Sequence, residues 1–390
     1  MNCWKKIIFF IGPALLAGSF IACSSVNSPK SVSAHKNLKL TLQRVADWQI
    51  RNFAYRDTCS PGCLHDYGVD AWTNGTLYIG MLEWAKLAGA GSPYFDWLEH
   101  IGSVSRWQIP ANFGHIPAYS YYHADELCVG QFYLGMYEIY RDTLMMRSNE
   151  QRACWIMNNP PDPDMRYGNK QSWTWCDALF MAPAVYIRLA VLENDDRYLQ
   201  FMDRQFRRTY DCLYDRENRL FFRDASYFSK KEQNGQQVFW GRGNGWVAAG
   251  LVNILKLLPE NSGYRPFYEQ LFKEFVPRLA QLQDHSGFWH ASLLDPESYP
   301  SPETSATALI TYALAYGIRT GLLPEKTYRP VLDRAWSALV SVVDADGKVG
   351  WVQPIGADPK KVTADMTAVY GVGAFLLAGT ELYALENKLR

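Results

Sequence analysis

One stretch of the sequence places an acid directly after two tryptophans. Trp173 and Trp175 precede Asp177, and an apolar run that predicts a buried helix follows it. Desolvation by indole rings raises the pKa of a carboxyl group, and a second carboxylate nearby raises it further. A carboxyl group that stays protonated near neutral pH can donate a proton to a substrate. Asp177 is therefore the predicted acid, and Trp175 is predicted to contact the substrate.

A second carboxylate stands at the start of another apolar helical stretch. Asp125 follows His123 and precedes a run rich in glycine and apolar residues. Two carboxylates that face one cleft are typical of enzymes that cleave glycosidic bonds. The sequence therefore predicts Asp125 and Asp177 as a catalytic pair.

A third stretch, Trp-Gly-Arg-Gly-Asn-Gly-Trp, runs from Trp240 to Trp246. Its glycines predict a flexible loop that a ligand can approach closely, at the N-terminus of an apolar helix where unpaired N–H groups favour anions. The guanidinium of Arg242 suits a carboxylate, and the indoles of Trp240 and Trp246 suit sugar rings. These three residues are predicted to bind an acidic sugar. The alternative is a glycine-rich turn whose tryptophans belong to the core.

Twelve stretches with helical periodicity must position these residues. Six are amphipathic, with one charged face, and are predicted to lie outside: 38–52, 94–107, 147–158, 195–213, 264–283 and 327–343. Six are rich in glycine, alanine and apolar residues and are predicted to be buried: 72–89, 125–143, 177–192, 244–258, 304–320 and 365–385. The two kinds alternate along the chain. This repetition predicts an all-α fold, an (α/α)6 barrel of six helical hairpins over residues 38–390.

The predicted inner helices begin with polar or charged residues, which a closed barrel would gather at one mouth. Asp70, Glu303 and Asp365 stand at such positions. Acidic residues there also cap helices and complement the helix dipole, so both roles stay open. Glu303 is predicted to bind substrate. Short aromatic stretches between the inner helices are predicted to wall the cleft: 219–228, 287–294 and 347–355.

The N-terminus has the features of an export signal. Two lysines precede an apolar run that is too short for the ~20 residues of a membrane span. The run ends at Ala22, and its small residues before Cys23 resemble a bacterial lipoprotein processing site. We expect a signal peptide over residues 1–22, lipidation of Cys23, a polar tether over 23–37 and an exported protein that only its lipid attaches to a membrane. Ordinary secretion is the alternative.

The composition narrows the set of partners. The 39 basic and 39 acidic residues balance, which argues against a nucleic-acid partner. The six cysteines after Cys23 are dispersed and lack paired metal-ligand spacing, so we predict neither a metal nor a cofactor. Fourteen tryptophans and 24 tyrosines are consistent with a carbohydrate-handling cleft as well as with a large helical core. The sequence leaves the oligomeric state open.

Four segments together resemble a known family. They are 240–246, the Trp-Cys-Asp-Ala-Leu-Phe-Met-Ala-Pro run at 175–183, the Pro-Glu-Thr-Ser-Ala run at 302–306 and the glycine-rich run at 370–379. In this order they resemble the unsaturated rhamnogalacturonyl hydrolases of glycoside hydrolase family 105, relatives of the unsaturated glucuronyl hydrolases of family 88. The resemblance extends from about Leu40 to the C-terminus and implies the same (α/α)6 barrel.

The resemblance also implies a reaction. Such enzymes remove a 4,5-unsaturated uronic acid from the non-reducing end of lyase-generated oligosaccharides by hydrating its vinyl ether. Asp177 matches the acid/base residue and Asp125 its partner aspartate. Trp240, Arg242 and Trp246 match residues that hold the unsaturated uronate. The expected partner is an unsaturated uronyl oligosaccharide of the rhamnogalacturonan or pectin type.

The sequence departs from the family in two places. Family members often carry a histidine before the glycine-rich loop, whereas this chain has Arg223 followed by Asp224, and Tyr167 and Lys170 only loosely match a lysine-containing stretch. Arg223 could serve a more anionic ligand or could only pair with Asp224. Two other functions stay open at this point: an inverting glycosidase acting on a saturated sugar, and a non-catalytic glycan-binding lipoprotein.

Overall fold

The computed structural model describes residues 29–54, 68–109 and 121–389. Its inner helices are α2 (Trp72–Ala88), α4 (Cys128–Tyr140), α6 (Ala178–Met181) with α7 (Pro183–Glu193), α9 (Gly241–Leu257), α11 (Thr304–Arg319) and α13 (Val369–Glu386). Its outer helices are α1 (Pro29–Arg51), α3 (Pro93–Ser105), α5 (Leu144–Asn158), α8 (Arg197–Leu213), α10 (Arg265–Gln281) and α12 (Glu325–Ser341). The two sets alternate along the chain, as the sequence predicts.

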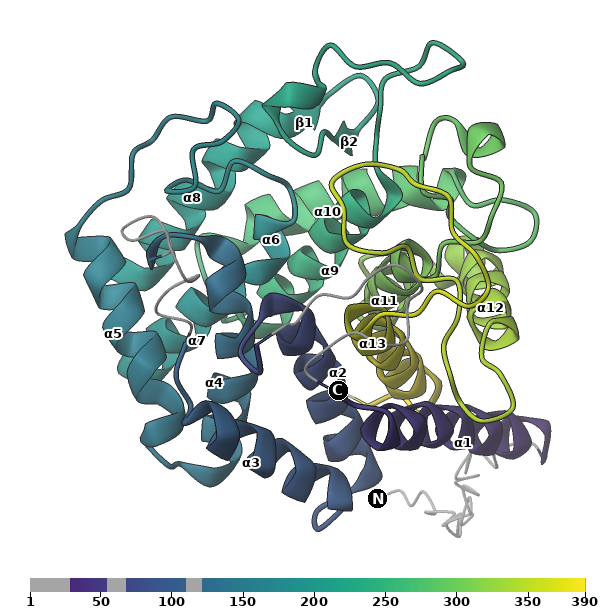
Figure 1. Cartoon of the computed structure of the whole chain (residues 1–390), viewed down its shortest axis with the longest axis horizontal. Helices are drawn as coiled ribbons and strands as arrows, with labels where there is room; N and C mark the ends of the chain where they lie inside the picture. The colour runs from purple at the N-terminus through teal and green to yellow at the C-terminus, as the bar shows by residue number, and fades with distance from the viewer. Residues whose placement is uncertain (1–28, 55–67, 110–120, 390) are drawn as a thin grey trace, which may run out of the picture.

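The inner helices form a closed ring. Each packs against the next in chain order, and α13 completes the ring by packing against α2. Each outer helix packs against an inner one, with α1 on α13 and α3 on α2. Figure 1 shows α1, α3, α5, α8 and α12 at the periphery of the molecule. The predicted all-α barrel is confirmed.

Glycines allow the ring to close tightly where α13 meets α2. A Cβ atom on Gly80 would collide with the carbonyl oxygen of Gly373, and one on Gly373 would collide with that of Thr76. Both backbones therefore lie in contact without side chains between them. The inner helices are buried against one another and against the outer helices, so they are apolar on nearly every side. Helix α13 is an example, with core residues from Val372 to Leu382.

Several helix boundaries differ from the prediction. The third inner helix is divided into α6 and α7 at Pro183, because proline has no N–H for the preceding turn. A short 3-10 helix, η2 (Ala124–Leu127), precedes α4. The last inner helix begins at Val369, so Asp365 is an exposed residue before it. Helix α1 begins at Pro29, inside the segment predicted as a tether.

The cleft-wall segments are mostly irregular. The first contains β2 (Leu220–Phe221), which pairs antiparallel with β1 (Tyr214–Asp215) just before the segment, and η3 (Ala225–Tyr227). The second contains no regular strand, but Ser292 forms a bridge with Trp240, and η4 (Pro296–Ser298) follows it. In the third, Val349 forms a bridge with Val343. Backbone contacts thus tie these segments to the inner helices.

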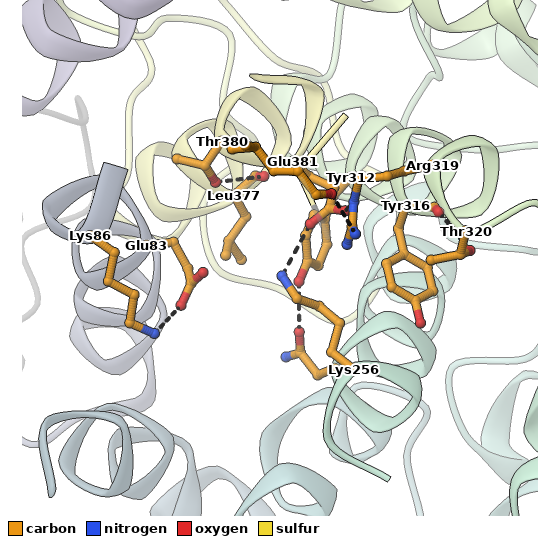
Figure 2. A network of polar contacts seen from close by, with 12 residues as sticks. Glu83, Lys86, Lys256, Tyr312, Tyr316, Arg319, Thr320, Leu377, Thr380 and Glu381 are labelled. Atoms are coloured by element: carbon orange, nitrogen blue, oxygen red, sulfur yellow. Dashed lines mark hydrogen bonds and ion pairs between the residues drawn. The ribbon is translucent and has the colours of Figure 1, made fainter. Parts of the chain in front are cut away.

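A network of charged side chains occupies the C-terminal end of the inner helices (Figure 2). Glu381 of α13 accepts from Lys256 at 3.1 Å and from Arg319 at 2.5 Å. Glu83 of α2 accepts from Lys86 at 2.7 Å. Burial opposes ionisation of Glu83, but the positive charges of Lys86 and Lys256 hold its pKa at about 2. The ion pairs of Glu381 thus connect α13 to α9 and α11 at the end of the barrel opposite the helix N-termini.

The predicted signal peptide and Cys23 lie outside the described residues, as do Cys59 and Cys63. Within the described ranges no helix has the length and apolar character needed to cross a membrane. Cys128, Cys154, Cys176 and Cys212 are free thiols.

Candidate active site

Asp177 is the N-cap residue of α6 and only 8% exposed. Backbone pairing fixes its position: the Cys176 N–H donates to the Arg223 carbonyl at 2.9 Å, and Trp175 forms a bridge with Asp224. Burial raises the pKa of Asp177; the positive charge of Arg223 opposes this rise, and the charge of Asp125 adds to it. The predicted acid therefore stays protonated to higher pH than an ordinary aspartate.

Asp125 lies in η2, close enough to Asp177 for its charge to act on that residue. One carboxylate oxygen is 3.8 Å from the Nδ1 atom of His123, and the other is buried without a hydrogen-bond partner. Burial raises the pKa of Asp125 to about 6, although the charges of Lys170 and Arg223 act in the opposite direction. The structure thus brings both predicted catalytic carboxylates together.

Two cations accompany the carboxylates. Arg223 donates from Nη1 to Asp224 at 2.5 Å. The Nζ atom of Lys170 lies 5.1 Å from the centre of the Trp175 ring, and Trp175 in turn stacks on the His123 ring at 4.7 Å. Burial, together with the positive charges of Lys170 and Arg223, lowers the pKa of His123 to about 3, so this histidine is neutral at physiological pH.

The glycine-rich motif is not a flexible loop, and this prediction is wrong. Helix α9 begins at Gly241, so the motif forms its first turns. The glycines are required by close packing instead. A Cβ atom on Gly241 would collide with the carbonyl oxygen of His290, and one on Gly243 would lie 2.9 Å from the Trp240 ring. The motif therefore packs α9 closely against its neighbours.

Arg242 is buried, with 1% of its surface exposed. Its two terminal nitrogens donate to the carbonyl oxygens of Gln353 at 2.5 Å and Pro354 at 2.9 Å. Its guanidinium also lies over the rings of Trp240 at 4.5 Å and Tyr370 at 5.0 Å. This geometry ties α9 to the third wall segment. Binding of a carboxylate by Arg242 stays a prediction.

The two tryptophans of the motif are covered by protein. Trp240 is 2% exposed and donates from its indole nitrogen to Gln353 at 3.2 Å. Trp246 is 1% exposed and contacts Phe180 and Trp72, with ring centres 4.8 and 6.2 Å apart. Direct contact of either indole with a sugar likewise stays a prediction.

Glu303 is fully buried at the N-terminus of α11. Its carboxylate accepts from the backbone N–H groups of Ser305 at 3.1 Å and Ala306 at 2.7 Å, and from that of Gln353 at 3.0 Å. These bonds satisfy helix N–H groups that would otherwise lack partners. The capping role left open by the sequence is thus present in the structure, and substrate contact by Glu303 stays a prediction.

Sequence reasoning missed Glu126. This residue is 1% exposed, and neither of its carboxyl oxygens has a hydrogen-bond partner. Burial raises its pKa to about 9, the negative charge of Asp125 adds to the rise, and Arg152 opposes it. The raised pKa favours the protonated form of Glu126 at neutral pH, beside the predicted catalytic pair. The only sequence signal was its place next to Asp125.

Comparisons with known proteins agree with this geometry. Residues 41–386 match the model of Glycosyl Hydrolase Family 88. The chain belongs to this family. A relative from Formosa agariphila named unsaturated 3S-rhamnoglycuronyl hydrolase is 36% identical, over 81% of this chain and 85% of its own. The predicted family and the predicted class of enzyme, a glycoside hydrolase, are confirmed.

Two solved structures resemble this family 88 protein over most of its length. One, a family 88 glycosyl hydrolase from Bacteroides vulgatus, has a TM-score of 0.79 and is 29% identical, covering 90% of this chain and 99% of its own. The other is titled a polysaccharide lyase and has the same TM-score and 30% identity, covering 92% of this chain and 99% of its own. The names of these relatives thus include both a hydrolase and a lyase.

Proposed function

We propose that the protein removes a 4,5-unsaturated uronic acid from the non-reducing end of lyase-generated oligosaccharides. Membership of family 88 and the name of the 36% identical relative support this substrate. The observation that carries the proposal is the pair of carboxyl groups of Asp177, which is buried, and Asp125, which is partly buried, each with a raised pKa, in an arrangement that includes two cations. A protonated acid beside positive charge suits an anionic sugar that must accept a proton.

The reaction proceeds by hydration of the vinyl ether. Asp177 donates its proton to C4, and the electron pair of the C4–C5 double bond forms the new C–H bond. Water adds to the electron-deficient C5 and gives up a proton to a carboxylate, for which Asp125 and the newly ionised Asp177 are both placed. The product is a hemiketal at C5, which opens and releases the remaining oligosaccharide.

A direct assay uses the absorbance of the unsaturated sugar. We expect the ultraviolet absorbance of unsaturated disaccharides from pectin, glycosaminoglycans or other uronans to fall when the enzyme is added. In heavy water the released uronate should carry deuterium at C4, and matched saturated disaccharides should not be cleaved. Cleavage of the saturated partner at a comparable rate would instead support an inverting glycosidase.

The same assay tests the lyase that one structural relative suggests. A lyase creates a double bond and would raise the absorbance of an intact polysaccharide. The hydrolase proposed here destroys that bond and should leave the intact polysaccharide unchanged. Binding without any change in absorbance would support a glycan-binding lipoprotein.

We also propose that the protein is exported and lipidated at Cys23, which places it where extracellular oligosaccharides arrive. The support is the apolar run that ends in small residues before this cysteine. Cys23→Ala should move the protein from the detergent-extracted membrane fraction to the soluble fraction. Continued membrane association of the variant would contradict the lipid anchor.

A further inference from the structure

Arg223 is held against the catalytic acid by the backbone. Its carbonyl oxygen accepts from the N–H of Cys176, the residue before Asp177. The adjacent Asp224 is anchored as well, since its Oδ1 atom accepts from the Ser226 N–H at 2.8 Å. Arg223 therefore cannot move far from Asp177 without disrupting this pairing.

The guanidinium of Arg223 has donors left over. Nη1 pairs with the Oδ2 atom of Asp224, whereas the buried Nε atom has no hydrogen-bond partner. A guanidinium carries five N–H donors in a planar fork and binds carboxylates and sulfates through two parallel bonds. A buried donor without a partner is costly, and a ligand oxygen could remove that cost.

Arg242, the other arginine of the site, makes more hydrogen bonds to protein than Arg223 does. The Nε atom of Arg242 is also buried without a hydrogen-bond partner, but Arg242 is 1% exposed and both of its terminal nitrogens donate to backbone carbonyl oxygens. The side chain of Arg223 is 19% exposed. Lys170 adds positive charge on the same side, since it acts electrostatically on both Asp125 and Arg223. The accessible positive charge near the carboxylates is thus centred on Arg223 and Lys170.

We infer that the Arg223 guanidinium binds an oxyanion of the substrate. This inference rests on the proposed function, and it makes Arg223 a specificity-determining residue of the same reaction. The oxyanion has two possible sources: the carboxylate of the unsaturated uronate itself, or a carboxylate or sulfate ester on the neighbouring sugar. Asp224 orients the guanidinium by occupying one side of its fork.

Steady-state kinetics of Arg223→Lys test the inference. Lysine keeps the positive charge opposite Asp224, which favours folding, but it cannot form the planar fork. We expect an increase in KM and a loss of about 10- to 100-fold in kcat/KM, the effect of one to two charge-assisted hydrogen bonds. The pH profile should not change, because the charge beside Asp177 is retained. Arg216→Lys, an exposed arginine between β1 and β2, is the matched control and should behave as wild type.

Three unsaturated disaccharides separate the two sources of the oxyanion. Their second sugar is neutral, carboxylated or sulfated. If Arg223→Lys loses kcat/KM equally on all three substrates, Arg223 binds the carboxylate of the unsaturated uronate. If the loss is confined to substrates with an acidic second sugar, Arg223 binds the acidic group of that second sugar. Unchanged kinetics on all three, or a shifted pH profile with unchanged KM, would overturn the inference. Inactivity of the wild-type enzyme on every unsaturated substrate would overturn the proposed function and the inference with it.

Discussion

At the scale of single residues, the site is a group of neighbouring carboxyl groups whose pKa values are raised. Asp177 and Glu126 are buried and Asp125 is partly buried, and burial raises the pKa of all three carboxyl groups. The negative charge of Asp125 raises the pKa of Asp177 and of Glu126 further. The positive charges of Lys170 and Arg223 oppose the rise for Asp125. A raised pKa favours the protonated form of the acid, which proton donation to carbon requires.

Asp177→Asn should fold normally and lose most of its activity. The amide has nearly the same shape as the acid, but it can neither donate a proton to C4 nor accept one from water. Acid–base groups of this kind typically contribute about a hundred- to ten-thousandfold to the rate. The measurement is kcat/KM on an unsaturated disaccharide, with the exposed Asp211→Asn as control. A variant with wild-type turnover would remove Asp177 from the mechanism.

Glu126→Gln should reduce the pH dependence of stability. Because burial and the charge of Asp125 raise the pKa of Glu126 to about 9 from an ordinary 4.5, the folded protein keeps a proton that the unfolded chain releases. Stability should therefore fall as pH rises between these values, by up to about 1.4 kcal/mol per pH unit from this group.

Denaturant unfolding of wild type and Glu126→Gln at several pH values in this window measures the effect. The glutamine variant, which has no proton to lose, should show the shallower decline and the higher stability at the alkaline end. Glu217→Gln, on the exposed turn between β1 and β2, should follow the wild type. Parallel curves for all three proteins would contradict the protonation of Glu126.

At the scale of elements, the N-terminus of α9 holds the site together. Its first turn pairs with the second wall segment through the Gly241 N–H, which donates to Ala291 at 2.7 Å. It joins the third wall segment through Arg242 and Trp240, which bind the backbone and side chain of Gln353. The glycines of the motif allow this approach. The motif thus packs α9 against two wall segments, and ligand binding by its residues stays a prediction.

Gly241→Ala should destabilise the protein and impair catalysis together. The added methyl group would collide with the carbonyl oxygen of His290, so α9 must shift away from the wall segment. Overpacking of this kind costs about 1–3 kcal/mol. The Tm of thermal unfolding and kcat/KM should both fall. Gly263→Ala is the control, because a methyl group there would meet no atom within 4 Å. Equal Tm values for the two variants would contradict the role of close packing.

At the scale of the whole molecule, the barrel has two chemically different ends. The end at the N-termini of the inner helices holds the carboxylates, Arg242 in the first turn of α9, and Arg223 from the first wall segment. Their C-terminal ends hold the network of Figure 2, with Lys256 and Arg319 on either side of Glu381. Cations near helix C-termini are also favoured by the helix dipoles. This network joins α9, α11 and α13 through charged side chains far from the catalytic pair.

Glu381→Gln should lower stability but spare catalysis. The change leaves two partly buried cations without their shared carboxylate. Breaking a buried ion pair from one side costs about 3–5 kcal/mol, and we expect the lower end of this range because both cations are partly exposed. Unfolding in denaturant should show this loss, while KM for an unsaturated disaccharide stays at the wild-type value. Glu325→Gln, whose ion pair is exposed, should cost less than about 1 kcal/mol. A large change in KM for Glu381→Gln would show that the two ends are coupled.

The helical barrel could be predicted from the sequence, because alternating amphipathic and all-apolar helices have few other ways to bury their surfaces. Asp177 and Asp125 could be proposed as well, since Asp177 follows two tryptophans whose indoles would desolvate it and both acids precede apolar helical stretches. The resemblance to family 105, and to its relatives in family 88, depends on short motifs that keep their order along the chain.

The surroundings of these acids could not be predicted from the sequence, because they depend on contacts between distant segments. The partners of Arg242 are 111 and 112 residues away, and Gly241 beside it faces the backbone of His290 in another segment. Arg223 and Lys170 reach the carboxylates from separate stretches, and the raised pKa of Glu126 depends on burial. Residue spacing reports contacts within one helix or strand. Contacts between distant segments, and the loss of water that they cause, exist only once the ring of helices has closed.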